Sequence, residues 1–229
     1  MNLNEWLLLF LSLNLIIFGG SYNLFRLAGI EGWKSLIPIY NIVKYLDIIN
    51  RPRWWVILVF IPVINLLMIP VIWVEFIKTF NHNSRLDRIL VIITLGFYIY
   101  YINYLSHKTK YIDTISFSNF EKSVGSFVFA IVIATFVHNY FLQPFVIPTG
   151  SLEKTLRVGD FLIVSKFHYG ARIPSTVISF PMVHDTIPII KSRSYLNKPQ
   201  LPYLRIPGFQ EIKNNDIVVF NWPADTVRK

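Results

Sequence analysis

The stretch SVGSFVFAIVIATFVHNYFL, from Ser123 to Leu142, is followed two residues later by FVIPTGSLEKTLRVGDFLIVSKFHYG, from Phe145 to Gly170. The first stretch contains no Asp, Glu, Lys or Arg. It has the length of about 20 residues that a helix needs to cross the hydrocarbon core of a bilayer. The second stretch groups proline, glycine and serine and then becomes β-rich. This junction predicts that the chain leaves a membrane and enters a domain of a different class.

The composition of the whole chain supports a membrane protein. Of 229 residues, 53% are hydrophobic and only 15% are charged, whereas ordinary soluble domains carry about 25% charged residues. The net charge of +9 comes from Lys and Arg scattered over loops. This pattern indicates membrane orientation and contact with anionic lipid, not nucleic acid binding. Cysteine is absent, which excludes disulfides and thiolate metal sites.

Three further apolar stretches precede Ser123. They cover residues 6–25, 54–74 and 89–105, and we expect each to span the membrane. Pro62 and Pro70 lie in the second stretch and predict kinks or a re-entrant shape, because proline removes a backbone donor. No internal repeat is apparent.

The distribution of basic residues orients these four expected spans. The loop between the first and second spans holds five Lys or Arg, and residues 106–122 hold three lysines. Since loops rich in Lys and Arg stay in the cytoplasm, we expect both termini on the extracytoplasmic side. The loop between the second and third spans, with Lys78, Arg85 and Arg88, is then also extracytoplasmic.

After Leu142 the sequence changes character. Nine prolines occur between residues 144 and 223, together with the short β-rich runs DFLIVSKF and DIVVF. We therefore expect a multi-span α-helical membrane region followed by a mostly-β extracytoplasmic domain. The expected boundaries are 1–122 for a region of about three spans, 123–143 for a fourth transmembrane anchor and 144–229 for the β-rich domain.

We expect Ser151 to lie in a tight turn, because Pro148 fixes φ and Gly150 relaxes it. Such a turn can present a hydroxyl and free backbone N–H groups, although an isolated Thr-Gly-Ser is usually just a turn. The surrounding pattern is more specific. FVIP, then TL-x-x-GD and KF-x-YG, and finally NDIVVFNWP from Asn215 to Pro223, together resemble the conserved boxes of bacterial type I signal peptidases.

This resemblance implies a serine–lysine dyad that cleaves signal peptides, with Ser151 as the nucleophile. It also implies an oxyanion hole formed by Thr149 and the Ser151 backbone N–H. The shallow substrate pockets of that family correspond to Phe145, Ile147, Pro148, Leu152 and Leu156. For Phe145, Ile147, Leu152 and Leu156, plain core packing is an equally good interpretation.

The chain departs from the family pattern at three points. Leu152 replaces a methionine and Lys154 replaces a proline. The lysine-bearing strand that supplies the family's general base is not found, since the sequence stops at ADTVRK, and Lys166 matches a structural lysine of the family. We therefore expect that residues 1–229 are an N-terminal fragment, inactive alone, and that the base lies beyond residue 229.

The sequence thus predicts a multi-pass serine endopeptidase of the bacterial plasma (inner) membrane with its catalytic domain on the extracytoplasmic side. Its expected partners are the signal peptides of exported preproteins and the lipid bilayer, with no nucleic acid. No cofactor or metal is implied. The alternative is a non-catalytic membrane binding or assembly factor that retains the peptidase scaffold.

Overall fold

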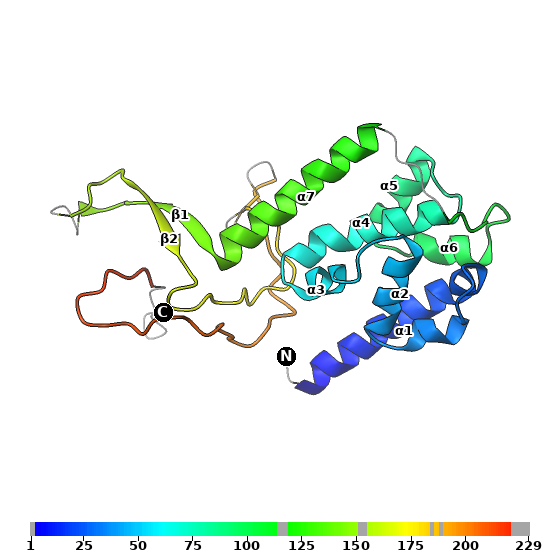
Figure 1. The fold of residues 1–229 in the computed structure, drawn as a ribbon, viewed down its shortest axis with the longest axis horizontal. Helices are drawn as coiled ribbons and strands as arrows, with labels where there is room; N and C mark the ends of the chain where they lie inside the picture. The colour runs from blue at the N-terminus through cyan, green and yellow to red at the C-terminus, as the bar shows by residue number, and fades with distance from the viewer. Residues whose placement is uncertain (1–2, 114–118, 151–154, 184–185, 188–189, 221–229) are drawn as a thin grey trace. The chain divides into compact units, whose positions relative to one another are not determined.

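The computed structural model describes residues 3–113, 119–150, 155–183, 186–187 and 190–220 (Figure 1). The chain divides into two compact units. Unit 1 contains residues 1–133 and 174–201, and unit 2 contains residues 134–173 and 202–229. Helices dominate unit 1, whereas unit 2 joins the end of a long helix to a small sheet.

Two long apolar helices coincide with the first and fourth expected spans. These are α1 (Leu3–Leu27) and α7 (Asn119–Tyr140). Within the described residues, they are the two helices long and apolar enough to cross a membrane. The 25 residues of α1 rise about 37 Å at about 1.5 Å per residue, which exceeds the hydrocarbon thickness of about 30 Å. Both helices leave most of their apolar surface exposed.

The second and third expected spans are each divided into two shorter helices. The four helices are α3 (Trp55–Phe60), α4 (Ile64–Thr79), α5 (Arg85–Ile93) and α6 (Tyr98–Tyr104). Pro62 lies in the break between α3 and α4, as its missing donor predicts, whereas α4 continues through Pro70. The break between α5 and α6 falls at Leu95 and Gly96, which have φ of 50° and 87°. Four continuous spans are therefore not confirmed.

A short sequence repeat accompanies two of the chain reversals in unit 1. Residues 37–41 read IPIYN and residues 61–65 read IPVIN. The third residue of each, Ile39 or Val63, has a φ of 66° or 71° and immediately precedes α2 (Tyr40–Ile48) or α4. Positive φ is a genuine outlier for a β-branched residue, so packing around both turns must hold it. The repeat escapes detection by sequence because it covers only five positions.

The core of unit 1 is built around a row of aromatic rings contributed by three helices. The ring centroids of Phe25 and Tyr45 are 5.4 Å apart, those of Tyr45 and Phe76 are 4.1 Å apart, and those of Phe76 and Phe80 are 5.0 Å apart. Phe25, Phe76 and Phe80 are completely buried. These contacts tie α1, α2 and α4 together, and the short 3₁₀ helix η1 (Gly32–Leu36) packs against α1.

Unit 2 contains a two-stranded antiparallel sheet directly after α7. Strand β1 (Leu142–Val146) pairs with β2 (Phe161–Ser165) in a register that places Leu142 opposite Ser165 and Phe145 opposite Leu162. In the rest of the described part of residues 144–220 there are only four isolated bridges. The mostly-β domain is therefore not confirmed, and the many prolines explain why, since proline cannot donate to a ladder.

Two segments of unit 2 that are distant in sequence approach each other closely. Ile206 N donates a hydrogen bond of 2.9 Å to Ala171 O, and Gln210 N donates one of 2.9 Å to His168 O. Glycine is required at this crossing because a Cβ on Gly208 would lie 2.5 Å from His168 O and from the carbonyl carbon of Tyr169. The crossing fixes the course of the chain after the KF-x-YG box.

Candidate active site

The β1–β2 hairpin continues beyond its two strands as far as Ile147 and Gly159. Ile147 N donates a hydrogen bond of 3.0 Å to Asp160 O, and Gly159 N donates one of 3.0 Å to Ile147 O. Gly159 has a φ of 93°, a conformation that favours glycine. The paired arms thus end at Ile147 and Gly159, and the part of the connecting loop that the structure describes consists of residues 148–150 and 155–158.

The C-terminal part of this loop is held by hydrogen bonds to the Asp160 carboxylate and backbone. Asp160 accepts a hydrogen bond of 2.8 Å from Arg157 N through Oδ2, and its own N–H donates one of 3.1 Å to Arg157 O. Asp216 acts similarly, accepting from Lys213 N at 2.9 Å and from the Tyr169 hydroxyl at 2.9 Å. The Lys213 N–H and then the Tyr169 hydroxyl lower the pKa of Asp216. Both aspartates organise local backbone, as Asx turns do.

The residues predicted from the peptidase resemblance fall at different places on this hairpin. Ser151 and Leu152 lie outside the described residues. Pro148 and Thr149 are exposed in the N-terminal part of the loop, whereas Leu156 is half-buried in its C-terminal part.

Phe145 and Ile147 share one face of β1 and its extension, because side chains alternate along a strand. Leu162, which stands opposite Phe145, shares that face. Phe145 is 37% exposed, and Ile147 is half-buried. An apolar face that leads directly into the loop suits a bound extended peptide. Core packing remains the alternative for Phe145, Ile147, Leu152 and Leu156, as the sequence left it.

Lys166 connects the hairpin to the end of α7. Its Nζ donates hydrogen bonds to His138 O at 3.0 Å and to Asn139 O at 3.1 Å, while its backbone N–H donates one of 2.8 Å to Phe141 O. The last carbonyls of a helix lack intrahelical partners and carry partial negative charge, so a cation is favourable there. Burial lowers the pKa of Lys166. The structural role expected for this lysine agrees with the geometry.

The histidines of unit 2 do not assemble a metal site. His168 Nδ1 makes a short hydrogen bond with Ser165 Oγ, and the His168 ring stacks on Phe167 at 4.4 Å between centroids. In the part of the chain that the structure describes, no group of three or more His, Cys, Asp or Glu is placed to hold a metal ion.

Comparison with known proteins identifies the segment that carries this hairpin. Residues 120–229 match the family described as "Signal peptidase, peptidase S26". This segment, just under half of the chain, is similar to type I signal peptidases. We call it the signal peptidase segment, and the resemblance expected from the motifs is confirmed.

Individual relatives agree with this assignment. Signal peptidase I of Rickettsia massiliae is 35% identical over 101 residues, which cover 44% of this chain and 31% of the relative. Signal peptidase I of Buchnera aphidicola is 44% identical over 71 residues, covering 31% of this chain and 22% of the relative. That of Haemophilus influenzae is 48% identical over 50 residues, covering 21% and 14%. The matched part thus spans about a third or less of these relatives.

The region before the signal peptidase segment has a separate affiliation. Residues 33–114 match a family of unknown function, DUF5684. No solved structure matches the chain significantly. The two matches meet near the start of α7, so the short helices of unit 1 are not part of the peptidase match.

Several structural contacts of the signal peptidase segment were not expected from sequence. The bonds from Lys166 to the last turn of α7 are one example. A second is an aromatic row in which Phe141 lies 5.4 Å from Phe136 and 6.4 Å from Phe167, and Phe167 lies 6.5 Å from Phe209. The sequence signal for both is the Lys-Phe pair of the KF-x-YG box, which supplies the ammonium and the central ring.

Proposed function

We propose that the complete protein is a membrane-bound serine endopeptidase that removes signal peptides from exported preproteins. The observation that carries the proposal is the match of residues 120–229 to the signal peptidase family. The paired arms that end at Ile147 and Gly159 support it, because the sequence between them contains the matching Pro-Thr-Gly-Ser stretch.

In the proposed reaction, Ser151 Oγ attacks the carbonyl carbon of the scissile peptide bond and its proton passes to a neutral lysine. The Thr149 hydroxyl and the Ser151 backbone N–H donate hydrogen bonds to the oxyanion that forms. One oxyanion donor typically contributes 10²- to 10³-fold in rate. The leaving amine takes the proton from the lysine, and water then hydrolyses the acyl-enzyme by the reverse proton path.

We propose that the general base is a lysine other than Lys166. A base must aim an unprotonated nitrogen at the serine hydroxyl, whereas Lys166 Nζ donates to two carbonyls at the end of α7. The relatives are much longer than the part that this chain matches. We place the general base in the part of the complete enzyme that corresponds to the unmatched part of these relatives.

The position of the loop relative to α7 suits a substrate that arrives from the bilayer. Strand β1 begins two residues after α7 ends at Tyr140. From there to Ile147 the chain extends about 17 Å at about 3.3 Å per residue. Signal peptides place a small-residue cleavage site just after their apolar region, so a short, anchored hairpin can reach it. We propose the bacterial plasma membrane as the location, with this loop on the extracytoplasmic side.

The direct test is cleavage of an exported preprotein by the complete, purified protein in lipid vesicles. The proposal expects one cut after the signal peptide, identified by sequencing the new N-terminus of the product. Binding of the preprotein without cleavage would instead favour the non-catalytic assembly factor.

A further inference from the structure

The polar ends of the short helices in unit 1 lie together. Arg51, just before α3, donates from Nη2 to Glu75 Oε1 at 2.6 Å and from Nε to Glu75 Oε2 at 2.8 Å. Glu75 belongs to the last part of α4. The start of α3 and the end of α4 are therefore adjacent, although a continuous span over residues 54–74 would separate them by about 30 Å of hydrocarbon.

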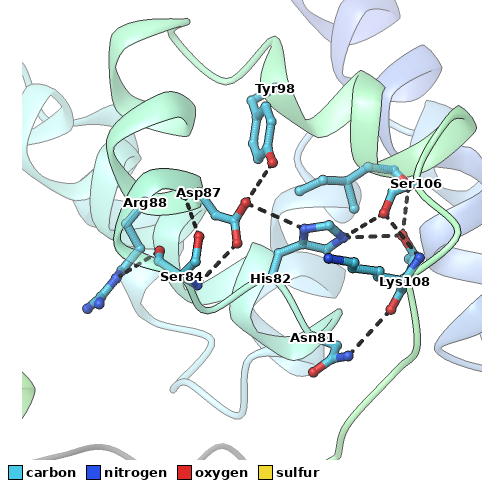
Figure 2. A network of polar contacts seen from close by, with 10 residues as sticks. Asn81, His82, Ser84, Asp87, Arg88, Tyr98, Ser106 and Lys108 are labelled. Carbon is cyan, nitrogen blue, oxygen red and sulfur yellow. Dashed lines mark hydrogen bonds and ion pairs between the residues drawn. The ribbon is translucent and has the colours of Figure 1, made fainter.

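The start of α5 and the end of α6 are likewise adjacent. Figure 2 shows His82, before α5, between Asp87 on one side and Ser106, after α6, on the other. His82 Nε2 lies 3.0 Å from Ser106 Oγ, and the Tyr98 hydroxyl donates a hydrogen bond of 2.7 Å to Asp87 Oδ1. The side chain of Asn81 donates to Lys108 O at 3.5 Å. Residues on either side of the third expected span thus meet at one place.

Backbone and side-chain bonds join these two meeting points. Ile112 N donates a hydrogen bond of 2.7 Å to Thr79 O, and Asn50 Nδ2 donates one of 2.9 Å to Asp113 O. We call the four joined segments, residues 50–53, 75–84, 106–109 and 111–113, the hairpin base. All four must lie on the same side of a membrane, because atoms within 3.5 Å of one another cannot stand on opposite sides of it.

The opposite ends of the hairpins are apolar and exposed. Near the α3–α4 reversal Ile57 is 62% exposed and Phe60 is 48% exposed; at the α5–α6 reversal Leu95 is 72% exposed. The Tyr100 hydroxyl bonds to Ile16 O, in the middle of α1. Ile16 is 11 residues before the end of α1 at Leu27, about 17 Å at about 1.5 Å per residue. The α5–α6 reversal thus reaches roughly half the depth of a spanned bilayer.

We infer that residues 54–105 do not cross the membrane but enter it from the cytoplasmic face as two re-entrant hairpins, α3–α4 and α5–α6. The acyl chains of the bilayer cover the exposed side chains of Ile57, Phe60 and Leu95. Val63 N, at the α3–α4 reversal, donates a hydrogen bond of 3.5 Å to Val177 O in the segment after α7, so this hairpin reaches the extracytoplasmic boundary and is covered there by protein. Irregular backbone is tolerated at membrane depth where protein buries it, and the reversals at Val63 and Gly96 meet this condition: Val63 is 5% exposed, and a Cβ on Gly96 would be 2.8 Å from the Trp73 ring.

The charges of the hairpin base agree with this arrangement. Its segments and their immediate neighbours contain Arg51, Arg53, Lys78, Arg85, Arg88, Lys108 and Lys110. Four crossings would place Lys78, Arg85 and Arg88 outside, against the preference of basic residues for the cytoplasm. Two hairpins place all seven inside and still leave α1 and α7 as the crossings, with both termini outside.

The inference rests on the proposed membrane location and is tested by site-directed labelling of the complete protein. The chain has no cysteine, so each introduced cysteine is a unique reporter. The three variants are Asn83→Cys in the hairpin base, His107→Cys in the loop before α7 and Glu211→Cys in unit 2; all three side chains are exposed. A membrane-impermeant maleimide is applied to intact spheroplasts and, separately, to inverted membrane vesicles. Preprotein cleavage by each variant controls for folding.

We expect Asn83→Cys and His107→Cys to be labelled only in inverted vesicles, and Glu211→Cys only in spheroplasts. Labelling of Asn83→Cys together with Glu211→Cys would overturn the hairpins and restore four crossings, while leaving the peptidase proposal intact. Labelling of all three sites from one side, with release of the protein by alkaline carbonate, would overturn the membrane location itself. Absence of cleavage by the cysteine-free parent protein, with the expected labelling of the variants, would count against the proposed activity only.

Discussion

Arg51 and Glu75 are 24 residues apart and form an ion pair with two hydrogen bonds, of 2.6 and 2.8 Å. The hydrogen bond to Glu75 raises the pKa of Arg51. Glu75 is only 8% exposed, so its carboxylate depends on the guanidinium for compensation. This pair joins the two ends of the α3–α4 hairpin more directly than the apolar contacts do.

Replacing Arg51 should therefore destabilise unit 1. Arg51→Met leaves a nearly buried carboxylate without its cation, and we expect a loss of about 3 kcal/mol in the free energy of unfolding. The measurement is denaturant unfolding of the complete protein in detergent. Arg53→Met is the matched control, because Arg53 pairs with Asp47 at an exposed site and should leave the unfolding midpoint nearly unchanged. Equal effects of the two changes would contradict this account.

Lys166 gives a prediction about alkaline pH. Burial lowers its pKa from 10.5, so the unfolded chain binds more protons than the folded one between the lowered value and 10.5. Stability should therefore rise with pH across that window, since deprotonation relieves the cost of the buried charge. Thermal unfolding of the wild type and Lys166→Met measures this. The rise should vanish in Lys166→Met and persist in the control Lys213→Met; an unchanged pH profile in Lys166→Met would assign the rise to other groups.

The crossing in unit 2 predicts a strong effect of one methyl group. In Gly208→Ala the new Cβ would lie 2.5 Å from backbone atoms of residues 168 and 169. Backbone cannot move aside as a flexible side chain can, so we expect a loss of about 3 kcal/mol. Gly125→Ala in α7 is the control, because a Cβ there meets nothing within 4 Å and alanine favours helix by about 1 kcal/mol over glycine. Unfolding monitored by near-ultraviolet circular dichroism separates the two, and a stable Gly208→Ala protein would show that the segments do not cross so closely.

Much of this architecture follows from the sequence where a pattern is long and uniform. The absence of charge from Ser123 to Leu142 predicts α7, and the motifs from Phe145 to Gly170 resemble those of the peptidase family. The helix α1 is predicted for the same reason as α7.

The short helices could not be predicted in the same way. Residues 54–74 are apolar enough to span a membrane, but hydropathy does not record the reversal at Val63 or the ion pair between Arg51 and Glu75. Both depend on contacts between distant residues. Likewise, DIVVF has strand propensity, yet residues 216–220 form no strand in the described structure, because a strand needs a partner and not only propensity.

Thr149 tests the proposed oxyanion hole. Thr149→Ala removes the hydroxyl and should lower the rate of preprotein cleavage by about 10²-fold or more, as loss of one oxyanion donor does. Thr149→Ser keeps the hydroxyl and should retain most of the activity. Single-turnover kinetics with excess enzyme isolate the chemical step. A wild-type rate for Thr149→Ala would remove this residue from the site, whereas equal losses in both variants would point to packing of the threonine methyl group instead.

The most direct test of the central claim is the rate of preprotein cleavage by the complete protein carrying Ser151→Ala. If Ser151 is the nucleophile, cleavage should fall by several orders of magnitude, because the members of a catalytic unit act together. The unfolding midpoint and preprotein binding should stay at wild-type values. The control is Ser192→Ala, an exposed serine outside the hairpin, which should cleave at the wild-type rate. Full cleavage by the Ser151→Ala protein would contradict the account.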